Sequence, residues 1–141
     1  MAYCTLADIL DQVDEAELQL YTDDADEGAV DTDVVDAAIA AAGALIDAYL
    51  AARYTVPVDP APAVLESMAV DIAVFKLAAR RNRETDSVRR RYEDAVKFLK
   101  DAAAGKAVIA GVTAASGSGS RDHAQIEADT RIFTRDKMKG F

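Results

Sequence analysis

Apolar side chains recur at helical spacing through most of the chain, and polar segments containing Gly or Pro interrupt them. In the first segment Thr5 stands where a helix N-cap is expected and Asp8 lies in the first turn. The apolar positions that follow on one face are Leu6, Ile9, Leu10 and Val13. Residues 15–21 add one or two further turns. Residues 22–33 are polar and acidic and contain Gly28, which predicts an exposed loop.

The next segment predicts one long helix, capped by one of residues 31–33. Its apolar stripe consists of Val35, Ile39, Ala42, Ile46 and Tyr49, and its alanines permit close approach of another helix. The helix is expected to end near Arg53 or Tyr54, because the prolines that follow disfavour helical geometry. Pro62, the last of them, suits the first position of a new helix.

Two more helices are predicted, one over residues 63–81 and one after a polar break at residues 82–86, with Gly105 as a stop. The first stripe contains Leu65, Met68, Ala69, Ile72, Phe75 and Ala79. The second contains Val88, Tyr92, Ala95, Leu99 and Ala102. The short connection makes this pair an antiparallel hairpin.

The character of the sequence changes after Gly105. Residues 106–113 are β-prone and predict either a strand or an extended arm. Residues 116–120 read SGSGS, a linker composition, and residues 126–141 alternate charges with apolar anchors. We therefore predict an all-α fold, a small bundle of about four helices with an α-hairpin. The helical domain spans residues 1–105, and residues 106–141 form an extended C-terminal arm and docking tail.

Charge is separated along the chain. The net charge is −9, the first 52 residues hold thirteen Asp or Glu and no Lys or Arg, and six arginines crowd the predicted hairpin tip. These are Arg80, Arg81, Arg83, Arg89, Arg90 and Arg91. Separated charge indicates contact with other macromolecules, while the overall negative field argues against generic binding to DNA or anionic lipid. Two simpler interpretations of these charges stay open. The acidic half can be an ordinary solvated surface, and the arginines can form ion pairs within the same hairpin, with Glu84, Asp86, Glu93 and Asp94.

Catalytic and metal-binding patterns are absent from the sequence. Cys4 is the only cysteine, so no intrachain disulfide can form, and its acidic neighbours disfavour a reactive thiolate. His123 has no second His or Cys at the spacing of metal ligands. The acidic loop fails the EF-hand pattern, because Ala25 and Val34 would occupy ligand positions. The apolar run at residues 37–46 is too short to span a bilayer, and the N-terminus lacks a signal peptide pattern. We expect no enzyme activity, no cofactor and no metal.

Five blocks along the chain read MAYCTLADIL, DAYLAARYTVPV, VLESMAVDIAVFKLAARR, RRRYEDAVKFLKDAAAGKAV and DTRIFTRDKMKGF. In this order they resemble the Mu-like phage and prophage family of head-tail connector proteins. The resemblance implies a helical adaptor subunit in a ring of about twelve copies beneath the portal, joining the DNA-filled capsid to the tail. It implies the portal protein and a tail-completion or tail terminator protein as partners, with double-stranded DNA passing through without specific binding. It places the protein in the virion neck, after synthesis in the bacterial cytoplasm, with no membrane contact.

The residue pattern and the resemblance together suggest three surfaces. The six arginines are candidates for the subunit interface. The acidic candidates for the channel or the interface are Asp23, Asp24, Asp26, Glu27 and Asp31. The tail is expected to dock on the portal or a neighbouring subunit, with apolar anchors and polar contacts at Arg131, Ile132, Phe133, Arg135 and Phe141.

Two alternatives belong to other classes. One is a DNA-binding helical module, a packaging or regulatory factor that uses the arginine-rich hairpin and binds more weakly as salt rises. The other is a bacterial scaffold protein without a phage context.

Overall fold

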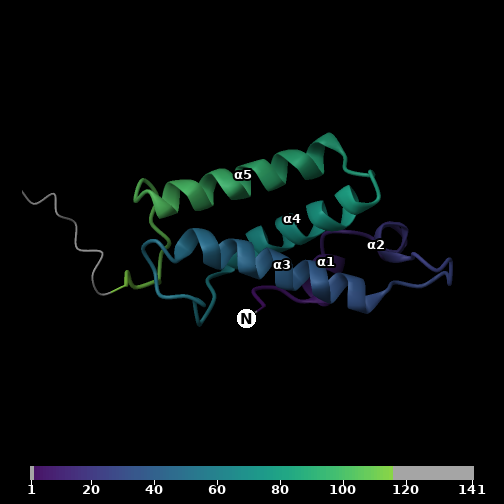
Figure 1. The fold of residues 1–141 in the computed structure, drawn as a ribbon, viewed down its shortest axis with the longest axis horizontal. Coiled ribbons are helices and arrows are strands. Elements are labelled where there is room, and N and C mark those ends of the chain that lie inside the picture. The colour runs from purple at the N-terminus through teal and green to yellow at the C-terminus, as the bar shows by residue number, and fades with distance from the viewer. Residues whose placement is uncertain (1, 116–141) are drawn as a thin grey trace, which may run out of the picture.

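The computed structural model describes residues 2–115, in which the regular secondary structure is helical apart from one isolated β-bridge. The helices are α1 (Leu6–Leu10), α2 (Glu15–Thr22), α3 (Thr32–Leu50), α4 (Ala63–Arg80) and α5 (Asp86–Ala103). The three long helices run back and forth along the long axis of the molecule (Figure 1). The short helices α1 and α2 pack against α3 and α4. The predicted all-α bundle is confirmed.

Helix α1 begins at a reciprocal cap. The Thr5 hydroxyl accepts a hydrogen bond from the Asp8 N–H at 3.4 Å, and the Asp8 carboxylate accepts one from the Thr5 N–H at 2.7 Å. These bonds satisfy N–H groups that the helix itself leaves unpaired. They also lower the pKa of Asp8. The predicted cap at Thr5 is therefore confirmed.

Helix α3 begins where predicted but ends earlier. Asp31 is its cap, accepting hydrogen bonds from the N–H groups of Asp33 and Val34. The last helical residue is Leu50, whose carbonyl accepts the N–H groups of both Arg53 and Tyr54 in a closing turn. The expected end near Arg53 or Tyr54 is thus a few residues late.

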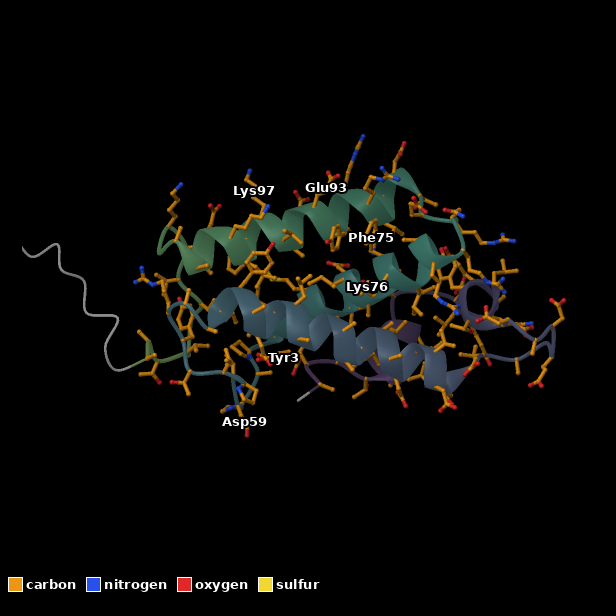
Figure 2. All side chains as sticks on the ribbon, viewed as in Figure 1. Tyr3, Asp59, Phe75, Lys76, Glu93 and Lys97 are labelled. Atoms are coloured by element: carbon orange, nitrogen blue, oxygen red, sulfur yellow. The ribbon has the colours of Figure 1, made fainter. Side chains whose placement is uncertain are left out.

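Helices α4 and α5 form the predicted antiparallel hairpin. Pro62 stands at the N-cap of α4, one position before the first helical residue predicted for it. Between the two helices the rings of Phe75 and Tyr92 stack with centroids 4.1 Å apart. Glu93 and Lys97 lie on the outer face of α5, away from the bundle (Figure 2).

Helix α4 lies at the centre of the core, because it contacts every other helix, as α3 also does, and contributes more buried residues than any of them. Its buried side chains are Leu65, Ala69, Val70, Ile72, Ala73, Val74, Leu77 and Ala78. Its closest neighbour is α3, which presents Ala38, Ala42 and Gly43 among its buried residues. Small side chains on both helices let the two backbones approach. The close approach of another helix that the alanines of this segment were expected to permit is made by α4.

The segment after α5 folds back on the helices without forming a strand within residues 106–115. Ile109 is buried, and its N–H donates to the Tyr54 hydroxyl at 3.5 Å. A single antiparallel bridge pairs Tyr54 with Ala114, and the Ala115 N–H donates to the Arg53 carbonyl at 2.8 Å. The described part of the arm therefore packs on the end of the bundle where α3 finishes.

The Tyr3 hydroxyl joins three segments that are distant in sequence. It donates to the carboxylate of Asp47 on α3 and accepts the Val58 N–H at 2.9 Å. Tyr3 lies beside α3 (Figure 2), and both Tyr3 and Val58 are buried. This hydroxyl therefore fixes the N-terminal segment and the proline loop to α3.

Replacing Tyr3 by Phe is expected to lower the free energy of unfolding by about 1–3 kcal/mol, because the buried Val58 N–H loses its acceptor. Burial and the Asp47 carboxylate raise the pKa of Tyr3 from 10.0 to about 12. The stabilisation is therefore complete below pH 10 and is lost as the pH rises through about 12. Urea denaturation between pH 7 and alkaline pH measures both effects.

The matched control is Tyr49→Phe. The Tyr49 hydroxyl is half-buried on α3 and makes no hydrogen bond with any of residues 2–115. If both variants unfold with the same free energy and the same alkaline slope, the Tyr3 hydroxyl does not hold these segments together.

Candidate functional site: the acidic loop and the arginine-rich turn

The acidic loop, residues 23–31, is closed by its own hydrogen bonds. The Asp23 carboxylate accepts the N–H groups of Glu27 at 2.9 Å and Gly28 at 2.8 Å. These donors lower the pKa of Asp23. At the base of the loop the buried Thr22 hydroxyl accepts the Asp31 N–H at 3.2 Å and donates to the Leu18 carbonyl at 3.0 Å. The shape of the acidic loop is therefore set by hydrogen bonds within the loop and by the N-cap of α3.

The acidic loop is bound to the arginine-rich turn, which we define as residues 80–91 at the junction of α4 and α5. Arg80 pairs with the Asp24 carboxylate, and its Nη1 also donates to the Tyr21 carbonyl at 3.1 Å. Arg81 Nε lies 3.3 Å from Asp24 Oδ1, and its guanidinium donates to the Asp23 carbonyl. The Arg80 guanidinium lowers the pKa of Asp24. Opposite charges that the sequence separates by more than fifty residues thus meet within one chain.

These contacts are exposed, and their individual contributions are small. The side chains of Arg80 and Asp24 are 38% and 46% exposed. Exposed pairs of this kind contribute little to stability, because water and salt screen them. They position the loop and leave it within reach of another molecule.

Two other arginines have partners on the helices. Arg89 pairs with Glu84 at 3.0 Å, and Arg91 lies 3.9 Å from the half-buried Asp71 of α4. Burial raises the pKa of Asp71, and Arg91 opposes that shift. Of the four pairing partners suggested on the hairpin, only Glu84 is used. Asp86, Glu93 and Asp94 form no ion pair with any of residues 2–115.

The last two arginines of the turn have no carboxylate partner among residues 2–115. Arg83 and Arg90 are exposed and form no ion pair within the described part of the chain. Arg83 lines a shallow pocket together with Gln19, Leu20, Asp23, Asp26 and Arg81. Leu20 is 52% exposed there, a large apolar side chain beside charges of both signs.

The five acidic candidates have unequal roles. Asp24 is paired, and Asp23 and Asp31 hold backbone N–H groups of the loop and of α3. Asp26 and Glu27 are exposed, and their carboxylates pair with no residue in the range 2–115. The sequence pattern could not distinguish these roles, because all five lie in one run.

The predicted docking tail lies outside the described residues. This applies to Arg131, Ile132, Phe133, Arg135 and Phe141, and also to the SGSGS segment and His123. Within residues 2–115 no three side chains are grouped to hold a metal ion, and no helix is long and apolar enough to cross a bilayer.

Fold and surface together define a small all-helical protein whose charged groups converge on a surface patch. The family described as Bacteriophage Mu, Gp36 matches residues 3–128, and the chain belongs to this family. It is 33% identical to gene product J of Escherichia phage Mu over 144 aligned positions, covering 100% of this chain and 99% of the relative. It is 36% identical to the Mu-like prophage FluMu protein gp36 of Haemophilus influenzae over 108 positions, covering 76% and 74%. The chain is thus a protein of Mu-like phages.

Proposed function

We propose that this protein is a head-tail connector, a subunit of a ring beneath the portal that joins the capsid to the tail and surrounds the DNA path. The role is assembly, without catalysis and without a cofactor. Membership of the Mu Gp36 family places the chain among phage proteins, and its resemblance to connector proteins supports the specific role.

The observation that carries the proposal is the difference between the two ends of the bundle. The acidic loop and the arginine-rich turn lie together at one end (Figure 1). Residue 115, from which the chain continues toward the tail, is bonded to Arg53 at the other end. A closed ring is built head to tail from two different surfaces on each subunit. An elongated subunit with unlike ends provides such surfaces.

Unpaired charges at the loop end suit the two expected contacts. Arg83 and Arg90 are the arginines best placed for a neighbouring subunit, because Arg80, Arg81, Arg89 and Arg91 have carboxylate partners in the same chain. The free carboxylates of Asp26 and Glu27 suit a channel, because they repel phosphate and let DNA pass without sticking. The connector is favoured over a DNA-binding module, because four of the six arginines already have carboxylate partners in the same chain.

Removing both free arginines, in Arg83→Ala/Arg90→Ala, is expected to weaken association with the portal protein while leaving the helix content unchanged. Each lost contact is worth about 0.2–1 kcal/mol, but the loss recurs at every interface of the ring. Sedimentation velocity of the chain mixed with portal protein measures the change. Lys97→Ala/Lys100→Ala removes the same charge from the outer face of α5 and is the matched control.

Binding to duplex DNA distinguishes the alternative function. A DNA-binding module would retard duplex DNA, lose that binding steeply as salt rises, and lose it in Arg89→Ala/Arg90→Ala/Arg91→Ala. A chain that retards DNA in this way and does not associate with the portal would overturn the connector proposal.

A further inference from the structure

A shallow groove is lined by the N-terminal residue Ala2 and by one face of α3. The N-terminal segment lies on the side of α3 away from α5 (Figure 1). The groove is lined by Ala2, Asp36, Ile39, Ala40, Ala44 and Asp47 and has a volume of about 350 Å³. That volume is at the lower end of the range for ligand pockets. It can seat a few side chains of an extended segment, but not a whole helix of another protein.

The groove is apolar with an anionic rim. Asp47 already accepts the Tyr3 O–H, whereas Asp36 is exposed and forms no hydrogen bond or ion pair with any of residues 2–115. The first 52 residues, which supply every wall of the groove, contain no Lys or Arg. A complementary occupant must therefore bring apolar and cationic side chains together. A second copy of the same α3 face would bring only more carboxylates.

One segment of this chain has that composition. Residues 131–138 read RIFTRDKM, which places Ile132, Phe133 and Met138 among three cationic residues. The other clustered cations are badly placed for the groove. The arginine-rich turn is largely paired at the loop end. Helix α5, which carries Lys97 and Lys100, lies on the other side of α3 from the N-terminal segment (Figure 1).

The tail is also tethered close to the groove. Ala115 is bonded to Arg53, just beyond the end of α3. At about 1.5 Å per residue, Ala40 and Ala44 lie roughly 15–20 Å from that point. The chain between residues 115 and 131 can span up to about 50 Å. A tether of this length maintains the tail at an effective concentration on the order of millimolar near its own groove.

We propose that, in the free subunit, residues 131–138 of the same chain occupy this groove. Ile132 and Phe133 contact Ala40 and Ala44, and Arg131 and Arg135 approach Asp36. The groove holds the tail until the portal or a neighbouring subunit displaces it, a role that rests on the proposed connector function. This arrangement covers the apolar anchors before assembly.

A nitroxide label on the full-length chain tests this placement. Thr134→Cys puts the label within the segment without removing a proposed contact, and the native Cys4 thiol is buried with its pKa raised to about 11, so it reacts poorly. We expect the amide signals of Asp36, Ala40 and Ala44 to lose most of their intensity, while those of Glu93 and Lys97 keep theirs. Asp36→Lys is expected to restore at least half of the lost intensity. Asp94→Lys, the same charge reversal on the exposed face of α5, is expected to restore none.

A second sample distinguishes the tail of the same chain from the tail of another copy. It mixes isotope-labelled chains that have no nitroxide with chains that carry the nitroxide but no isotope. Loss of signal at Asp36, Ala40 and Ala44 in that mixture, where the observed chains carry no nitroxide, would mean that another copy's tail fills the groove, which overturns the proposal. Equal intensity at all sites, or loss that Asp36→Lys leaves unchanged, would also overturn it. None of these outcomes bears on the connector proposal, which depends on portal binding and fails separately if the chain ignores the portal.

Discussion

Replacing Ile72 by Ala is expected to lower the free energy of unfolding by about 2–5 kcal/mol, the largest loss of stability among the changes considered. Ile72 is fully buried in α4, which contacts every other helix and contributes more buried residues than any of them. Several of the buried residues of α3 and α4 are alanines, which have no longer side chain that could move in to fill a cavity. A domain of this size is typically stable by only about 5–15 kcal/mol. Urea denaturation followed by circular dichroism measures the loss.

Val64→Ala is the matched control on the same helix. Val64 is 39% exposed, so its truncation is expected to change stability by less than about 0.5 kcal/mol. Equal losses for the two variants would show that α4 is not the centre of the core.

Deleting residues 126–141 is expected to abolish stable docking on the portal while leaving the helical fold intact. The segment carries the apolar anchors Ile132, Phe133 and Phe141. Anchors of this type commonly dominate the free energy of an interface. The fold should persist because residues 2–115 supply a buried core of their own, in which Ile109 is the last buried residue of that range. Co-sedimentation with portal protein and circular dichroism measure the two outcomes.

Phe133→Ala extends this test to a single anchor and is expected to weaken docking by an order of magnitude or more. Replacing SGSGS by another Gly/Ser sequence of equal length preserves the tether and is expected to leave docking unchanged. Docking that survives the deletion would show that the tail is not the portal contact.

The helices could be predicted because their signals are local. Thr5 and Asp31 cap helices as their side-chain chemistry predicts, and the apolar stripes of α4 and α5 are the faces that become buried. The predicted end of α3 differs from the observed one by only a few residues, for a reason that the packing provides. Helix α3 ends at Leu50 because the turn that buries Tyr54 begins before the prolines do.

The contacts that build the candidate site could not be predicted, because they join residues that no local pattern relates. Nothing in the sequence indicates that Arg80 and Arg81 select Asp24 from thirteen early carboxylates, or that Arg91 reaches Asp71. The Tyr3 hydroxyl bridge between Asp47 and Val58 was missed for the same reason. Which charges of the acidic loop and the arginine-rich turn find partners depends on how the folded chain places these two segments side by side.

Electron microscopy of the purified chain, alone and mixed with its portal protein, tests the connector role most directly, with mass analysis of the same samples. We predict monomers or loose oligomers of the chain alone, and closed rings seated on the portal in the mixture. A chain that remains monomeric in the presence of portal, with no added density on the portal particles, would contradict the proposed role.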